Sequence, residues 1–162
     1  MDQTPQVREA TAAERPEVAE VTRLSYAQYA VGSTPEFWAR YEDSTRKKLL
    51  EDDDARRFVV LTDGRIVASV LWCPPNEQNP YPEMRLLAVL PEHRNRKLGD
   101  LLIKACETLT RTEGFEAITL HTTALMPTAR SMYERRGYRP FPDLDFEPAP
   151  GFVVWGYKKR LA

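Results

Sequence analysis

The most regular apolar pattern in the chain runs from residue 98 to 113. Five apolar residues recur at spacings of three and four, so they form one stripe along a helix: Leu98, Leu101, Leu102, Ala105 and Leu109. Gly114 stands where a glycine commonly follows a helix. The pattern predicts an amphipathic helix over 98–113 that packs one face against a core.

Two helices are predicted earlier in the chain from their starting residues. Thr11 and Glu14 have capping-box spacing and predict a helix that continues to about Tyr29. Thr34 followed by Pro35 combines a capping residue with a proline at the first helical position. This second helix is expected to run toward Leu50.

Strands are predicted around turn signals and between the helices. The turn Asp63-Gly64 separates two apolar runs, 57–62 and 65–73, and predicts a hairpin. A short helix is expected over 127–136, and further strands over 6–9, 83–90, 115–121, 138–141 and 152–159. This order favours an α/β (α+β) fold built on a mixed sheet.

Composition narrows the class of protein. The 162 residues carry 23 Lys and Arg against 24 Asp and Glu, a net charge of −1, so a nucleic-acid partner is not expected. The longest apolar run is Leu86–Leu90, too short to cross a membrane, and the first residues lack a secretory signal pattern. Cys73 and Cys106 form no metal-binding spacing and are both expected to pack in the interior. We therefore expect a single cytoplasmic domain over 1–162, with no metal and no membrane partner.

The segment from Leu86 to Asp100 carries the clearest chemical signal. A strand ends, a short basic turn with Arg94, Arg96 and Lys97 follows, and the predicted helix begins. Unpaired N–H groups at a helix start attract anions, and Gly99 allows a close approach of the backbone. The pattern indicates a phosphate-binding turn; a solvated basic turn without a ligand is the alternative. The phosphate-loop patterns of kinases and of NAD enzymes are absent.

Two motifs together resemble those of the GNAT superfamily, the acyl-CoA-dependent N-acyltransferases. The first is Val89-x-Pro91-x-x-Arg94-x-Arg96-x-x-Gly99. The second spans Ala129 to Tyr138 and has the pattern Ala-x-x-apolar-Tyr-Glu-basic-x-Gly-aromatic. One helix and one strand separate them, which is the order found in that family.

The resemblance implies a mixed, mostly antiparallel twisted sheet flanked by helices, and acetyl-CoA as the co-substrate. It also implies direct attack of an amine on the thioester, which needs no cysteine nucleophile. The acetyl-CoA site is then expected at Leu87, Ala88, Val89, Arg94, Asn95, Arg96, Lys97, Leu98, Gly99, Asp100 and Ala129. Lys97 replaces a glycine of the usual loop, and Met126 replaces an asparagine that many members carry. Because of these departures, a non-catalytic acyl-CoA sensor or interaction module with the same fold is the alternative.

Catalytic roles follow from the same resemblance. Tyr133 matches the position of the acid that protonates the departing thiolate, and a phenol suits that step. A backbone N–H of Leu87, Ala88 or Val89 is expected to contact the thioester oxygen. Glu83 and His121 are the two candidates for the base, and loss of the proton to water is a third route.

The acceptor is expected to be a primary amine of a small molecule or a peptide. Tyr29 and Trp38 are candidates for an aromatic wall of its site. Asp143 and Asp145 lie in a proline-rich segment, 140–150, and would recognise a cationic acceptor; an acidic surface loop is the alternative. Asp52, Asp53 and Asp54 are expected to form only a hydrophilic end of the second helix. The sequence leaves open whether the chain acts as a monomer or a homodimer.

Overall fold

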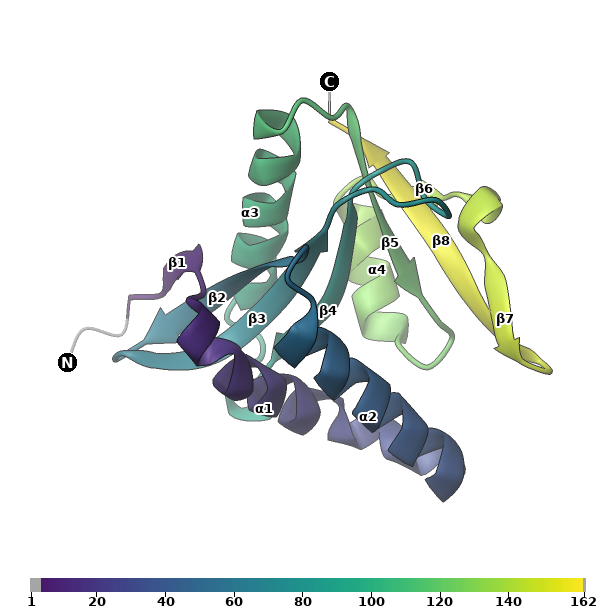
Figure 1. The fold of residues 1–162 in the computed structure, drawn as a ribbon, viewed down its shortest axis with the longest axis horizontal. Coiled ribbons are helices and arrows are strands. Elements are labelled where there is room, and N and C mark those ends of the chain that lie inside the picture. Colours follow the sequence, from purple (N-terminus) through teal and green to yellow (C-terminus); the bar gives the residue numbers. More distant parts are fainter. Residues whose placement is uncertain (1–3, 162) are drawn as a thin grey trace.

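The computed structural model describes residues 4–161, and one twisted sheet runs through them (Figure 1). Its strands are β1 (Gln6–Glu9), β2 (Arg56–Thr62), β3 (Arg65–Cys73), β4 (Glu83–Val89), β5 (Ala117–Thr122), β6 (Arg139–Pro140), β7 (Phe146–Ala149) and β8 (Phe152–Arg160). The spatial order is β1-β2-β3-β4-β5-β8-β6, and β7 pairs with β8. Within the described residues, β4 and β5 form the one parallel pair, so the expected mixed, mostly antiparallel sheet is confirmed.

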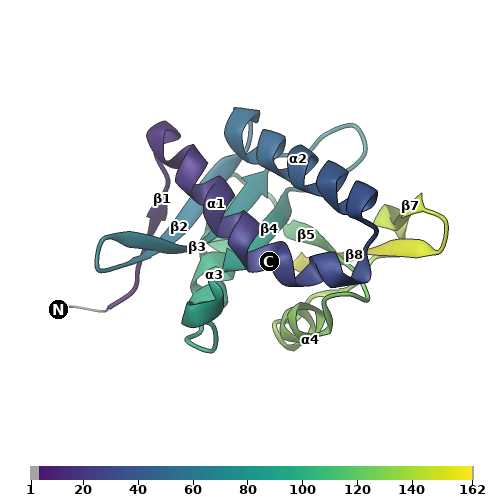
Figure 2. The same cartoon turned by 90° about the horizontal axis from the view of Figure 1, so that it is seen from below.

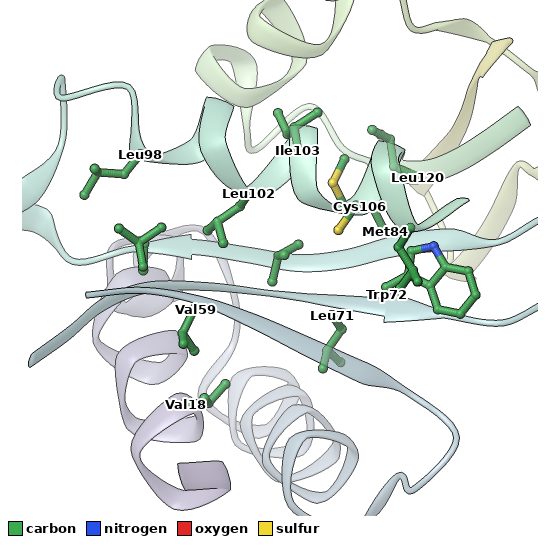
Figure 3. Packing of buried hydrophobic residues seen from close by; sticks show 14 of the residues in the cluster. Val18, Val59, Leu71, Trp72, Met84, Leu98, Leu102, Ile103, Cys106 and Leu120 are labelled. Atoms are coloured by element: carbon green, nitrogen blue, oxygen red, sulfur yellow. The ribbon is translucent and has the colours of Figure 1, made fainter. Parts of the chain in front are cut away.

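Helices cover both faces of the sheet (Figure 2). α1 (Arg15–Tyr26) and α2 (Pro35–Glu51) lie on one face, and α3 (Leu98–Thr112) and α4 (Pro127–Arg135) on the other. Val18 of α1 packs from one side of the strands, and Leu102 and Cys106 of α3 pack from the other (Figure 3). In the described part of the chain, none of these helices combines the length and apolarity needed to cross a membrane.

The predicted helix starts and the predicted hairpin are confirmed. Thr11 and Glu14 form the capping box, and the Thr34 hydroxyl accepts a hydrogen bond from the Phe37 N–H. Asp63 and Gly64 have φ values of 51° and 74°, as a type I′ turn requires. These local signals decide the local structure because each one satisfies backbone groups without help from distant residues.

Two predicted boundaries were wrong. The first helix ends at Tyr26, and residues Ala27–Gly32 continue as a 3-10 helix, a common way for an α-helix to end. The proline-rich segment 140–150 contains a 3-10 turn, Pro142–Leu144, and the strand β7. Pro148 fits in β7 because that strand pairs on one side only, with β8, so its missing N–H leaves no ladder partner unsatisfied.

The two central strands separate toward their carboxyl ends (Figure 1). β4 and β5 pair at Glu83 with Thr119 and at Met84 with Leu120, and no further along. Just beyond, Leu86 has a φ of 55° and the register between β3 and β4 shifts, which marks a bulge in β4. The bulge turns the end of β4 away from β5 and opens the sheet at its centre.

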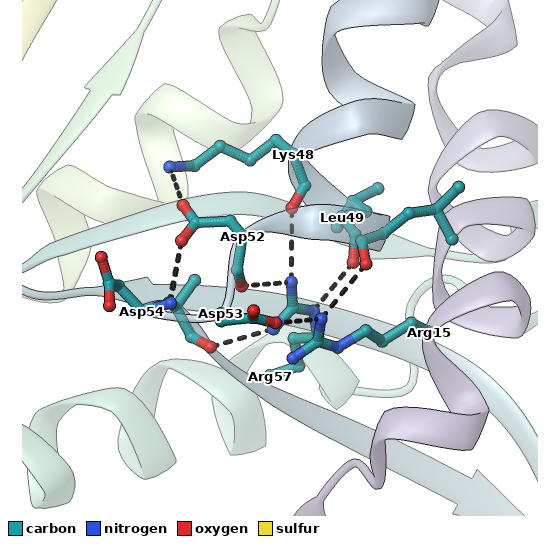
Figure 4. Close-up of polar contacts among 9 residues, drawn as sticks. Arg15, Lys48, Leu49, Asp52, Asp53, Asp54 and Arg57 are labelled. Carbon is teal, nitrogen blue, oxygen red and sulfur yellow. Dashed lines mark hydrogen bonds and ion pairs between the residues drawn. The ribbon is translucent and has the colours of Figure 1, made fainter.

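A buried arginine fixes the end of α2 (Figure 4). Arg57 of β2 is 4% exposed and donates hydrogen bonds to the carbonyl oxygens of Lys48, Leu49, Asp52 and Ala55. A cation at the carboxyl end of a helix satisfies its unpaired carbonyls and its dipole. Asp52 and Asp53 form ion pairs with Lys48 and Arg15, so the acidic run is more than a hydrophilic helix end.

Candidate active site

A cleft of about 850 Å³ lies where the central strands separate. Its walls come from α1, α2, the central part of β4, the end of β5, Tyr133 of α4, and the hairpin β7–β8. The cleft therefore joins elements that are far apart in sequence, and it contains Glu83, His121 and Tyr133, the three residues to which the sequence assigned catalytic roles.

Glu83 and His121 form a direct pair on the floor of the cleft. His121 Nδ1 lies 3.0 Å from Glu83 Oε2. Burial raises the pKa of the Glu83 carboxyl, but the hydrogen bond and charge of His121 outweigh burial, so the net pKa lies below the usual 4.5. Glu83 is thus ionised at neutral pH.

The two neighbours of the His121 ring favour its protonated form. Its other ring nitrogen, Nε2, lies 2.9 Å from the carbonyl oxygen of Leu144. A carboxylate and a carbonyl oxygen both accept, so both ring nitrogens donate only when the imidazole is protonated. Burial lowers the pKa of His121, but the bond to Glu83 outweighs it and the net pKa is above 6.5.

Tyr133 is buried, yet its hydroxyl reaches the cleft. The side chain is 7% exposed, and its ring packs edge-on against Tyr138 with 6.0 Å between centroids. Among the described residues no group forms a hydrogen bond with the Tyr133 hydroxyl. Burial raises the pKa of this phenol well above 10, so it stays protonated and can donate.

The basic turn before α3 presents a row of free backbone donors. Asn95 and Lys97 adopt left-handed φ values of 65° and 60°. Within residues 4–161, the backbone N–H groups from Asn95 to Gly99 donate to no protein acceptor. Successive N–H groups in such a turn, followed by a helix start, form a concave anion site. The geometry fits a phosphate group. Arg96 and Lys97 belong to the same turn, and the Arg96 guanidinium lies 3.3 Å from His93 Nδ1.

Arg94 has a different environment from the rest of the turn. Its guanidinium donates to the Ser25 carbonyl at 2.8 Å and to Gln28 Oε1 at 2.6 Å. The Val89 N–H donates to the Ser25 hydroxyl at 3.2 Å. Arg94 and the Val89 amide are therefore engaged with α1 and the 3-10 helix after it, and neither is free for a ligand in this arrangement.

The other expected cofactor residues divide between cleft and interior. Leu87 lines the cleft, and its carbonyl accepts from the Tyr26 hydroxyl at 2.8 Å. Ala88 and Leu98 are buried in the core, and Ala129 packs against it. Asp100 is held by Arg136 at 2.9 Å, and a Cβ on Gly99 would meet Met132 at an ordinary 3.7 Å. These residues therefore offer a ligand mainly their backbone atoms.

The expected acceptor residues are only partly brought together. Tyr29 and Trp38 line the cleft, but Asp143 and Asp145 do not. Asp145 Oδ1 accepts a hydrogen bond from the Gly156 N–H at 2.7 Å, which fixes the segment to β8. The same segment instead gives the cleft Phe146, Pro148 and Ala149, which are apolar.

Arg85 is the main cleft residue that the sequence reasoning missed. It follows Glu83 by two residues on β4 and shares its face of the sheet. The period-two spacing from Glu83 was the available signal. Phe152 was also missed as a wall residue, and nothing local to it indicated the cleft.

Comparison with known proteins gives a consistent result. Residues 19–138 match the sequence model of the acetyltransferase (GNAT) family. The structure of PaiA N-acetyltransferase from Thermoplasma acidophilum, in complex with coenzyme A, has a TM-score of 0.78 at 16% identity over 97% of this chain and 99% of that one. An aminoglycoside 6'-N-acetyltransferase complexed with coenzyme A gives 0.74 at 15% identity, with 97% of each chain covered. At such identities the likeness shows a shared fold.

A curated relative adds a sequence match of limited extent. The probable N-acetyltransferase camello of Xenopus tropicalis is 25% identical over 93 residues, or 57% of this chain. The match spans 42% of that protein's length, so this chain corresponds to less than half of it.

Proposed function

Because the chain belongs to the acetyltransferase (GNAT) family, we propose that it is an acyl-CoA-dependent enzyme that transfers the acetyl group of acetyl-CoA to a primary amine of a small molecule or a peptide. The observation that carries the proposal is the cleft at the central separation of the sheet. It holds an ionised carboxylate, Glu83, and an unpartnered phenol, Tyr133, in one space. Amine acetylation needs one group that accepts a proton and one that donates a proton.

The acetyl-CoA phosphates would lie against the turn before α3. The free N–H groups of Asn95 to Gly99 and the charges of Arg96 and Lys97 support this placement. The backbone of Leu87 would contact the thioester oxygen, since the Val89 amide is already bonded to Ser25. Arg94 would act from a distance, by holding the turn against α1.

Proton transfer would use the two ends of the cleft. Glu83 would accept the proton of the attacking ammonium, directly or through a water, because it is the anionic member of its pair. His121 would be a positioning residue, since a ring that donates from both nitrogens has no lone pair left to accept. Tyr133 would give its proton to the departing sulfur.

Two measurements test this function. Calorimetric titration with acetyl-CoA should show binding. In assays with a panel of primary amines, acetyl-CoA should release its free thiol, and the product should be about 42 mass units heavier than the amine, the mass that an acetyl group adds. Binding without turnover on any amine would favour the acyl-CoA sensor. Failure of acetyl-CoA to bind at millimolar concentration would contradict both functions.

The compartment is proposed on separate grounds. Cys73 and Cys106 are both buried and unbridged. Free thiols are typical of reducing compartments, which supports a cytoplasmic protein.

A further inference from the structure

The charged residues of the cleft are mostly cationic. Among the described residues that line it, Arg40, Lys48, Arg85 and His121 carry positive charge, and Glu83 is the one carboxylate. A substrate with several amines would meet repulsion from these groups. The charge pattern therefore opposes a polycationic acceptor and favours one that brings a negative group.

Arg85 is the cation best placed to bind such a group. Its side chain is 45% exposed, and within the described residues its guanidinium forms no hydrogen bond. In the described part of the chain its one ionic neighbour is Glu83, at 3.5 Å from Nε to Oε2. A guanidinium that keeps its donors free can bind a carboxylate with two parallel hydrogen bonds.

The other cations are less available or farther from the chemistry. Lys48 is paired with Asp52 at the end of α2. Both ring nitrogens of His121 already form hydrogen bonds, one with Glu83 and one with the Leu144 carbonyl. Arg40 is exposed on α2, whereas Arg85 belongs to β4, the strand that also carries Glu83 and Leu87.

Glu83 and Arg85 together match a zwitterion. They lie two residues apart on one strand and on one face, with opposite charges 3.5 Å apart. An ammonium on Glu83 and a carboxylate on Arg85 would both be satisfied by a molecule that has the two groups on one carbon.

Aromatic side chains line the same cleft as this charged pair. Trp38 and Tyr41 lie together on α2 with 5.3 Å between ring centroids. Phe37 meets Phe152 across the cleft at 5.9 Å, and Phe146 packs against His121 at 5.4 Å. Such walls fit an apolar or aromatic side chain.

Resting on the proposed acetyl transfer, we infer that the acceptor is an α-amino acid with an apolar or aromatic side chain, bound by Arg85 through its carboxylate. The ammonium loses one proton toward Glu83, which passes it to solvent, and the amine nitrogen then forms a C–N bond with the acetyl carbon as the C–S bond breaks. The nitrogen gives its second proton to solvent, which leaves a neutral amide. The sulfur leaves with the bond's electron pair and is protonated by Tyr133, which recovers a proton from solvent. The products are the N-acetyl amino acid and free CoA.

The test compares two amines that differ by one carboxylate. L-Phenylalanine and 2-phenylethylamine are assayed at saturating acetyl-CoA with the parent and with Arg85→Gln. The parent should favour L-phenylalanine by at least about tenfold in kcat/KM, and Arg85→Gln should lose about 10- to 100-fold with L-phenylalanine only, as the loss of one or two charged hydrogen bonds gives. Arg65→Gln, at an exposed arginine outside the cleft, should change neither value.

Further measurements separate a lost contact with the acceptor from a general loss of stability or of acetyl-CoA binding. The melting temperature and the KM for acetyl-CoA of Arg85→Gln should equal those of the parent, and Arg85→Lys should give an intermediate loss because it keeps the charge without the paired donors. If acetyl-CoA binds and 2-phenylethylamine is acetylated as well as L-phenylalanine, or neither is acetylated, the amino-acid acceptor is rejected while acetyl-CoA use stands. If acetyl-CoA does not bind, the proposed function itself fails.

Discussion

His121 Nε2 donates to the carbonyl oxygen of Leu144 at 2.9 Å, and this bond ties the floor of the cleft to the segment before β7. The same ring donates to Glu83 from Nδ1, so one imidazole joins β4, β5 and the β6–β7 connection. The segment 140–150 thus contributes to the site through its backbone, whereas the sequence had pointed to its aspartates.

The Glu83–His121 pair should make stability depend on pH in a defined window. His121 has a folded-state pKa above 6.5, so its contribution is full below that pH and is lost as pH rises through the folded pKa. Glu83 has a folded pKa below 4.5, so its contribution is present above 4.5 and is lost as pH falls through the folded value. The difference in unfolding free energy between the parent and His121→Asn, from urea titrations, should peak between these two limits. A difference that is flat from pH 4 to 9 would contradict the charged pair.

Tyr133→Phe should lower kcat by about 10²- to 10⁴-fold and leave acetyl-CoA affinity unchanged. The melting temperature should stay within a few degrees, because the hydroxyl has no protein partner among the described residues. Steady-state kinetics and calorimetry measure the three quantities.

Tyr138→Phe is the matched control for Tyr133→Phe. The Tyr138 hydroxyl donates to the buried Glu107 at 2.8 Å, so its loss should reduce stability by about 1–3 kcal/mol and leave kcat intact. If both variants lose activity in proportion to stability, Tyr133 has no chemical role.

Lys97 carries a positive charge and has a strained backbone conformation. Two variants separate the effect of the charge from the effect of the strain. Lys97→Gln removes the charge and keeps a side chain at a φ of 60°; Lys97→Gly removes both. Both should weaken acetyl-CoA binding and reduce its salt dependence, since one cation near the phosphates is lost. Lys97→Gly should be more stable than Lys97→Gln by up to about 1 kcal/mol, because glycine adopts this φ without strain. Unchanged affinity in both variants would remove Lys97 from the site, and Lys104→Gln, on the helix that follows Lys97, serves as a charge control.

Arg57→Met should destabilise the fold by several kcal/mol, since each buried acceptor left without a partner costs about 1–3 kcal/mol. The substitution leaves four carbonyl oxygens at the end of α2 without the donors that the buried guanidinium supplies. Arg56→Met removes the adjacent arginine, whose partners Glu9 and Glu113 are exposed, and should cost at most about 1 kcal/mol. Similar losses in the two variants, measured by urea unfolding, would mean that the four bonds add nothing beyond a surface ion pair.

Local signals predicted the elements well and the assembled site less well. The apolar stripe of 98–113 and the Asp63-Gly64 turn depend on nearby residues, and the structure confirms both elements. The Glu83–His121 contact joins residues 38 positions apart through the parallel pairing of β4 and β5, which no local pattern encodes. β7 was missed because its prolines suggested a loop, and only its pairing with β8 makes it a strand.

Arg94 has a consequence for how two ligands would influence each other. It links the turn that offers free N–H groups to Ser25, which neighbours the cleft residue Tyr26. A ligand on the turn that strengthens or breaks this link changes the free energy of arranging the acceptor wall. Thermodynamic reciprocity then requires the acceptor to change the affinity for that ligand by the same factor. With both ligands bound as proposed, one guanidinium would couple two binding equilibria, and heterotropic cooperativity between co-substrate and acceptor would be set by the strength of its bond to the end of a helix.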